Sequence, residues 1–255
     1  MPRALVTGGS RGIGAAFADR LAAKGCDLLL VGRDEQRLSA TATAIRRTHG
    51  VDADVLVADL ARERDLALVE EHAAAGVDIL INNAGFAHPA PFLRVPVEDE
   101  TRMLRVHCEA VLRLTHAALP AMNARGRGGI INVASIWALC PRSTYGASKA
   151  WITAFSESLR HGNTVRPGVR VMALCPGYVR TELHQRTGRD VSRVPGFLWT
   201  PAADVADIAL RDLARNQRLS IPGTPYRILA ALGGISPRIP SLILGRLGSR
   251  HRRHT

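Results

Sequence analysis

A glycine-rich segment near the N-terminus constrains the fold of this chain more than any other feature. It follows a short apolar stretch, residues 3–7, and precedes an alanine-rich stretch that runs to about residue 24. This order predicts a buried strand, a tight turn and a helix, and the free N–H groups that begin such a helix bind phosphate. Glycines let the backbone approach a pyrophosphate closely, so a dinucleotide site is expected here. The residues expected to form it are Gly8, Ser10, Arg11, Gly12, Ile13 and Gly14.

The same order of strand and helix repeats along the following residues. Apolar segments at residues 27–31, 53–57 and 78–81 predict strands, and residues 34–48 and 62–74 between them predict helices. Alternating strands and helices form parallel sheets with right-handed crossovers, in which ligands bind at the carboxyl ends of the strands. We therefore expect an α/β fold with its binding site along that edge.

The second half of the chain continues the pattern. The expected strands are residues 129–133, 169–174 and 219–223, and the expected helices are residues 98–122, 145–160 and 202–215. Residues 178–199 are expected to contain a mobile lid, and residues 226–248 two short amphipathic helices interrupted by glycine and proline. This divides the chain into one domain over residues 1–223 and a basic, amphipathic extension over residues 224–255.

Length and composition fit this division. The chain has 255 residues, of which 46% are hydrophobic, enough for a sizeable core. The four cysteines are scattered without a Cys-x-x-Cys pair, which argues against a disulfide framework or a metal site and fits a reducing cytosol. The first apolar stretch is too short for a signal peptide, and no apolar run approaches membrane-spanning length. We expect a cytoplasmic protein that holds no metal ion.

Positive charge is concentrated toward the C-terminal end. The formal net charge is +12, and the segment after Asp212 has eight arginines and no acidic residue. Such a segment would contact an anionic membrane surface or an acyl carrier that bears phosphate, and the alternative is a solvated tail without a partner. Nucleic acid is not an expected partner, because the segment has few aromatic residues and matches no nucleic-acid-binding motif.

The end of the second predicted strand decides between the two nicotinamide cofactors. A carboxylate there would bind the ribose 2′-OH and repel a 2′-phosphate. This chain has Arg33 instead, with Arg11 nearby in the glycine turn, and two guanidinium groups can hold a phosphate. We therefore predict NADP(H), and interpret Asp34 as a helix N-cap. Asp59, beside Leu60 after the third strand, would either accept from the adenine amino group or cap the next helix.

Tyr145 and Lys149 have the spacing of neighbours on one face of a helix. An ammonium group one turn away favours the phenolate and lowers the pKa of a phenol, so the pair is a candidate proton donor and acceptor for carbonyl chemistry. The chain has 34 lysines and arginines, and only Lys24 and Lys149 are lysines, which favours a specific need for lysine at position 149. The alternative is an ordinary surface pair on an amphipathic helix.

Together these segments resemble the short-chain dehydrogenase/reductase family over essentially the whole chain. The resemblance is carried by the glycine turn, Asp59-Leu60, Asn82-Asn83-Ala84-Gly85, Ser135, Tyr145 with Lys149, and Pro176-Gly177 with Thr181. It implies a single Rossmann-type domain with a seven-stranded parallel sheet. It also implies a small-molecule carbonyl or alcohol as substrate and assembly as a homodimer or homotetramer.

The resemblance also implies roles for individual residues. Tyr145 would donate a proton to a carbonyl oxygen while hydride arrives from the nicotinamide, and Lys149 would hold the nicotinamide ribose. Ser135 would hydrogen-bond the same oxygen, the alternative being a helix cap. The residues expected to line the cofactor beyond the glycine turn are Arg33, Asp59, Leu60, Asn83, Ala84, Gly85, Tyr145, Lys149, Pro176, Gly177, Val179 and Thr181.

The long helix departs from the family pattern at His107. Members usually place an asparagine there, which holds a water in a proton relay. His107 would either keep this relay as a catalytic residue or be a packed histidine without a role. We expect His107→Ala to lower turnover far more than His116→Ala, and equal small effects would support packing alone.

The stretch between Ser135 and Tyr145 is also shorter than in most members. A shorter loop makes the substrate pocket wider or differently angled, with Trp137, Leu139 and Cys140 as its wall or as core. The sequence therefore predicts NADP(H)-dependent reduction of a ketone or other carbonyl in a hydrophobic or carrier-linked substrate. The alternatives are a specialised natural-product reductase with an altered relay, and a non-catalytic NADP(H)-sensing protein.

Overall fold

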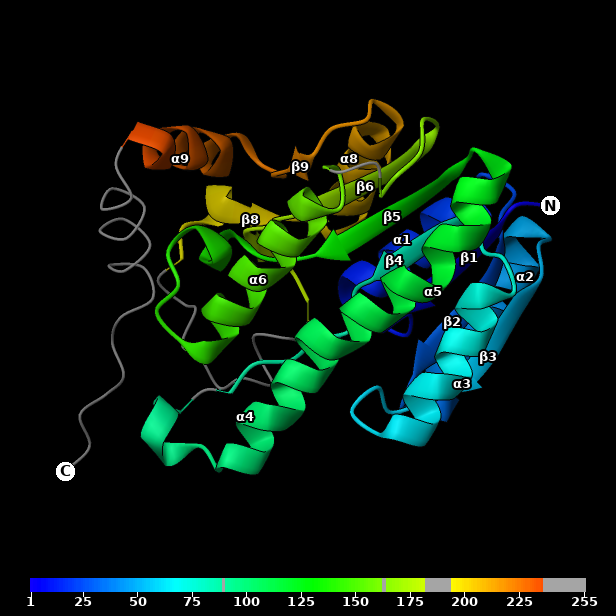
Figure 1. Cartoon of the computed structure of the whole chain (residues 1–255), viewed down its shortest axis with the longest axis horizontal. Coiled ribbons are helices and arrows are strands. Elements are labelled where there is room, and N and C mark those ends of the chain that lie inside the picture. Colours follow the sequence, from blue (N-terminus) through cyan, green and yellow to red (C-terminus); the bar gives the residue numbers. More distant parts are fainter. Residues whose placement is uncertain (89, 162–163, 182–193, 236–255) are drawn as a thin grey trace.

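The computed structural model describes residues 1–88, 90–161, 164–181 and 194–235, and a parallel sheet lies at its centre (Figure 1). Its seven strands have the order β3-β2-β1-β4-β5-β6-β9. They are β1 (Arg3–Thr7), β2 (Asp27–Gly32), β3 (Ala53–Val57), β4 (Ile79–Asn82), β5 (Gly128–Val133), β6 (Val169–Leu174) and β9 (Leu219–Ser220). The strand order reverses between β1 and β4, which is where such sheets bind ligands. The predicted Rossmann-type α/β fold with seven parallel strands is confirmed.

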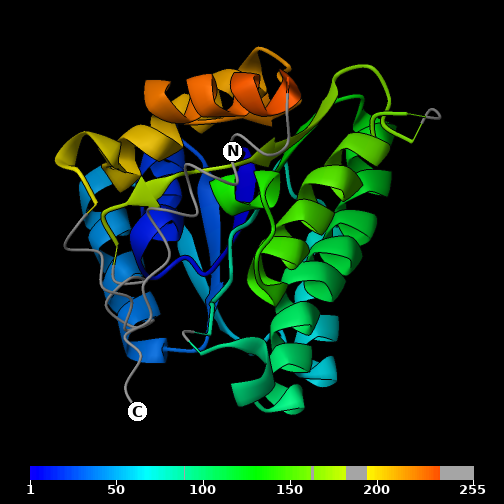
Figure 2. The same cartoon turned by 90° about the vertical axis from the view of Figure 1, so that its left-hand side faces the viewer.

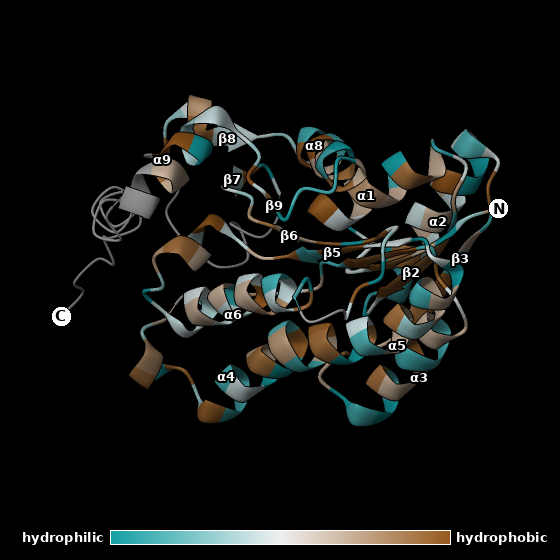
Figure 3. Ribbon diagram, turned by 45° about the horizontal axis from the view of Figure 1, so that its top comes forward, coloured by the Kyte–Doolittle hydropathy of each residue, from teal (hydrophilic) through white to brown (hydrophobic). Residues whose placement is uncertain are grey.

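Helices cover both faces of the sheet (Figure 2). One layer contains α1 (Gly12–Ala22), α2 (Glu35–His49) and α8 (Ala202–Ala214), and the other contains α3 (Glu63–Ala74), α5 (Ala110–Arg125) and α6 (Thr144–Ser158). Successive side chains of a strand point to opposite faces, so Ala4 and Val6 join the core under α1, whereas Leu5 joins the core under α3 and α5. The hydrophobic strands at the centre are visible in Figure 3.

Side-chain caps begin two helices that matter for the site. Asp34 caps α2 as predicted, because its Oδ1 accepts from the N–H of Arg37 at 3.1 Å. Ser143 caps α6, where its Oγ accepts from the N–H of Gly146 at 3.2 Å. The cap fixes the start of α6 one residue before Tyr145.

The prediction of one continuous helix over residues 98–122 is wrong, because a π-helical turn interrupts it. The structure has α4 (Val97–Leu104), a π-helical turn (Arg105–Glu109) and then α5. A π turn inserts an extra residue and shifts the face that the following residues present. The π turn contains Val106 and His107, and both side chains are buried.

The described residues end at residue 235, within the predicted C-terminal extension. Helix α9 (Thr224–Ile235) corresponds to the first predicted amphipathic helix. The second predicted helix and most of the basic tail lie outside the described residues. Residues 182–193 of the predicted lid also lie outside the described residues. The two short strands that flank them, β7 (Tyr178–Val179) and β8 (Trp199–Thr200), pair in parallel. Within the described part of the chain, no helix combines the length and apolar character needed to cross a membrane.

Candidate active site

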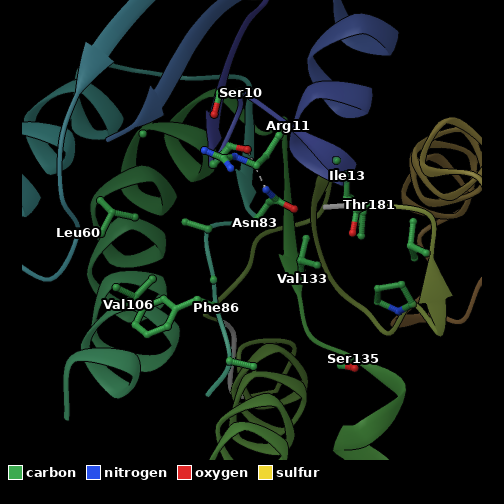
Figure 4. A pocket seen from close by; sticks show the side chains of 18 of the residues that line it. Ser10, Arg11, Ile13, Leu60, Asn83, Phe86, Val106, Val133, Ser135 and Thr181 are labelled. Carbon is green, nitrogen blue, oxygen red and sulfur yellow. Dashed lines mark hydrogen bonds between the residues drawn. The ribbon is translucent and has the colours of Figure 1, made fainter. Parts of the chain in front are cut away.

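A cavity of ≈ 690 Å³ lies at the carboxyl ends of the central strands (Figure 4). In Figure 4, Ser135 and Thr181 lie on one side of it and Leu60 on the opposite side. Its wall contains every residue predicted to line the cofactor except Gly14, together with Ser135, Tyr145 and Lys149. His107, which the sequence suggested as a catalytic residue, is absent from this wall.

The glycine turn fits a dinucleotide because side chains would block it. A Cβ on Gly14 would lie 2.1 Å from the carbonyl oxygen of Gly8, so Gly14 lets α1 start against the turn although it does not line the cavity. Gly12 has φ +54°, a conformation that favours glycine. Asn83 ties this turn to β4, because its Nδ2 donates to the carbonyl oxygen of Thr7 at 2.9 Å. The first turn of α1 therefore remains open to a pyrophosphate.

Arginines partner the carboxylates at the predicted adenosine end of the cavity, which contains Arg33, Asp34 and Asp59. Asp34 forms ion pairs with Arg11 at 3.5 Å and with Arg37 at 3.2 Å, and Asp59 pairs with Arg102 at 2.5 Å. Arg33 is exposed on the cavity rim. Neither carboxylate therefore presents an uncompensated negative charge to a ligand.

Asp59 has features of both predicted roles. Its Oδ1 accepts from the N–H of Ala61 at 3.1 Å, which stabilises the turn before α3, and it also lines the cavity. Burial alone would raise the pKa of Asp59, but the bonds from Ala61 and Arg102 and the charge of Arg33 outweigh burial and lower it. The carboxylate therefore stays ionised and can accept further hydrogen bonds.

Lys149 lies beneath Tyr145 on α6, as the spacing predicted. Its Nζ is 5.7 Å from the centroid of the Tyr145 ring and donates to the carbonyl oxygen of Val133 at 2.8 Å. The side chain is buried, and this burial lowers the pKa of Lys149 to about 8. A buried ammonium group with one backbone partner is costly to fold, which argues against an ordinary surface pair.

Ser135 follows β5 by two residues, and the structure shows its predicted role as a helix cap. Its Oγ accepts from the N–H of Trp137 at 3.3 Å and so caps the short 3₁₀ helix Ile136–Leu139. The hydroxyl hydrogen is not used in that bond and can be donated to a ligand in the cavity. The cap holds Ser135 on the wall that also contains Tyr145.

His107 links the irregular segment after β4 to α6, the helix that carries Tyr145. Its Nε2 accepts from the N–H of Phe86 at 3.2 Å, so Nδ1 carries the hydrogen and donates to the Oγ of Ser148 at 2.8 Å. Ser148 in turn donates to the carbonyl oxygen of Tyr145 at 2.8 Å. Burial, reinforced by the charges of Lys149 and His88, holds the pKa of His107 well below its usual range. Both ring nitrogens are engaged, which supports the packed alternative over the proton relay.

Replacing His107 with Ala is expected to lower the free energy of unfolding by about 2–4 kcal/mol, because the N–H of Phe86 loses its acceptor and a cavity remains. Turnover should fall with stability, while the dependence of kcat on pH keeps its shape. Chemical denaturation and a pH–rate profile measure both quantities. His116→Ala, at an exposed position of α5, is the control. Loss of an inflection near neutral pH would support the relay instead.

Several wall residues were not predicted from the sequence. Phe86 and Tyr178 line the cavity, and the only local signal for them was their position next to Gly85 and Gly177. Trp137, predicted as either pocket wall or core, lines the cavity. Leu139 and Cys140 do not; they belong to an apolar cluster that also contains Tyr226 of α9.

Comparisons with known proteins agree with this geometry. A family model described as short chain dehydrogenase matches residues 2–192. Very-long-chain 3-oxoacyl-CoA reductases of Anas platyrhynchos and Phaeosphaeria nodorum are each 33% identical, over 71% and 88% of this chain, and the matches span 60% and 67% of those proteins. The structure of a short-chain dehydrogenase from Sphingobium yanoikuyae in complex with NADPH is 33% identical with a TM-score of 0.83, covering 100% of this chain and 98% of that one.

Proposed function

We propose, from the premise that this chain belongs to the short-chain dehydrogenase family, that it reduces a carbonyl group in an apolar or carrier-linked substrate with NADP(H). One observation carries the proposal: a single cavity is lined by the glycine turn and by Ser135, Tyr145 and Lys149. Membership of the family makes the chain an oxidoreductase. The proposed cofactor and substrate class depend on the residues that line this cavity.

The adenosine end supports NADP(H) over NAD(H). Arg33 occupies the position where a carboxylate would select the ribose 2′-OH, and Asp34 is compensated by Arg11 and Arg37. A guanidinium group on the rim is suited to a 2′-phosphate. A related structure holds NADPH.

Three side chains would act on the carbonyl group. Ser135 would donate a hydrogen bond to the carbonyl oxygen, and Tyr145 would transfer a proton to it. The ammonium group of Lys149 would stabilise the phenolate that remains, and would hold a ribose hydroxyl. When bound, NADPH supplies the hydride that reduces the carbonyl carbon.

The cavity that contains Tyr145 also has apolar side chains in its wall, and these favour an apolar substrate. Among them are Phe86, Trp137 and Tyr178. Two relatives are named as reductases of very-long-chain 3-oxoacyl-CoA. We therefore propose 3-oxoacyl thioesters and bulky apolar ketones as the substrate class.

Oxidation of NADPH in the presence of 3-oxoacyl thioesters of increasing chain length tests this function. Each added methylene that enters an apolar site contributes ~0.8 kcal/mol, so kcat/KM should rise about three- to fourfold per carbon until the pocket is full. Comparing coenzyme A with N-acetylcysteamine thioesters tests the contact with a carrier. Tight NADPH binding without oxidation by any carbonyl compound would favour a sensor.

Replacing Arg33 with Ala is expected to raise the KM for NADPH about 10- to 100-fold, because a charge-assisted hydrogen bond to the 2′-phosphate is lost. The KM for NADH should change little. Steady-state kinetics with both cofactors measure the ratio. Arg47→Ala removes the same charge from an exposed position of α2 and is the control. A parent enzyme that prefers NADH would refute the assignment.

A further inference from the structure

Tyr226 of α9 is a buried polar residue that the proposed mechanism does not use. Its side chain is 2% exposed. The hydroxyl group accepts from the N–H of Tyr178 at 3.0 Å and donates to the carbonyl oxygen of Leu198 at 2.8 Å. Burial raises the pKa of Tyr226 to about 12, so the phenol stays protonated and keeps both bonds.

The Tyr226 ring also occupies the space beside Gly177. A Cβ on Gly177 would lie 2.0 Å from this ring, so the backbone and the ring are packed without room for a side chain. Gly223, with φ +98°, brings the start of α9 equally close, since its Cβ would lie 3.0 Å from the same ring. Two glycines that are far apart in sequence thus meet one aromatic ring.

The opposite end of the same backbone segment is attached next to Ser135. The carbonyl oxygen of Pro176 accepts from the N–H of Ile136 at 2.9 Å. Pro176, Gly177 and Tyr178 all line the cavity. The segment is therefore held between two points, one beside Ser135 and one on α9.

We propose that Tyr226 is a positioning residue for the cofactor: it holds the backbone of Gly177 and Tyr178 at the end of the cavity that contains Ser135 and Tyr145, where the nicotinamide of NADP(H) would bind. Helix α9 thereby contributes to cofactor affinity without touching the cofactor. This inference rests on the proposed function. It predicts that loss of the hydroxyl group weakens contacts at the nicotinamide end and leaves the adenosine end unchanged.

The test is Tyr226→Phe, which keeps the ring against Gly177 and removes both hydrogen bonds. Fluorescence titration should show a Kd for NADPH about tenfold higher than that of the parent, because a buried N–H and a buried carbonyl lose their partners and the segment relaxes. The Kd for adenosine 2′,5′-bisphosphate, which has the adenosine and its 2′-phosphate but no nicotinamide, should stay within about twofold.

A stability control separates positioning from general loosening of the fold. Val69→Ala removes buried methyl groups from α3, remote from α9, and should lower Tm without changing either Kd. Unchanged NADPH affinity in Tyr226→Phe, or an equal loss of affinity for both ligands, would overturn the inference. A parent protein that does not bind NADPH would instead overturn the proposed function.

Discussion

Tyr145→Phe is expected to lower kcat by about 10²–10⁴-fold while the Kd for NADPH stays close to that of the parent. Phenylalanine keeps the ring that packs edge-on to His107, with centroids 5.6 Å apart, and it keeps the helix that carries Lys149. The substitution removes the proton donor. Stopped-flow or steady-state oxidation of NADPH measures the rate, and fluorescence titration measures the binding.

Tyr178→Phe is a matched control for this prediction. It removes a second phenol from the wall of the same cavity, but Tyr178 lies on β7 and has no buried ammonium group beneath it. Its loss of kcat should be far smaller. Equal rates for Tyr145→Phe and the parent would remove the basis of the proposed mechanism.

Features set by local sequence could be predicted. The strands, the glycine turn, the Asp34 cap and the spacing of Tyr145 and Lys149 depend on neighbours within a few residues, and the structure shows each of them. Periodicity and capping act over such distances. The strand predicted over residues 219–223 is shorter, because Pro222 has no N–H to continue the ladder.

Features set by distant contacts could not be predicted. His107 is engaged by Phe86 and Ser148, the latter 41 residues away, and Tyr226 by Tyr178, 48 residues away. The π turn that carries His107 has no signature in the local pattern, which reads as a continuous helix. Which of the two proposed roles His107 has therefore depended on geometry that the sequence does not contain.

Lys149→Met is expected to stabilise the ligand-free protein near neutral pH while it lowers turnover. Burial lowers the pKa of Lys149 to about 8 from 10.5, a difference that costs the folded state about 3 kcal/mol when the group is charged. Methionine has a similar length and no charge. The carbonyl oxygen of Val133 loses its donor, which offsets about 1 kcal/mol, so the net gain should be about 2 kcal/mol.

The sign of the pH dependence follows from the direction of the pKa shift. Below pH 8 both folded and unfolded chains carry the proton, and the folded parent bears the full cost of the buried charge. Between pH 8 and 10.5 the unfolded chain binds more protons than the folded one, so the stability of the parent rises with pH. The advantage of Lys149→Met should therefore be largest below pH 8 and shrink as the pH rises through this window.

Lys24→Met is a control that the composition of this chain provides, because Lys24 is the second of its two lysines and is exposed. It should change neither stability nor turnover. Denaturant titrations of the parent and both variants at pH 7 and pH 10 measure the effect, since other titrating groups cancel in the differences. A Lys149→Met variant that is stabilised and inactive would mean that the buried ammonium group is needed for catalysis and lowers the stability of the fold. A Lys149→Met that is destabilised at pH 7 would mean that the ammonium group holds the fold together.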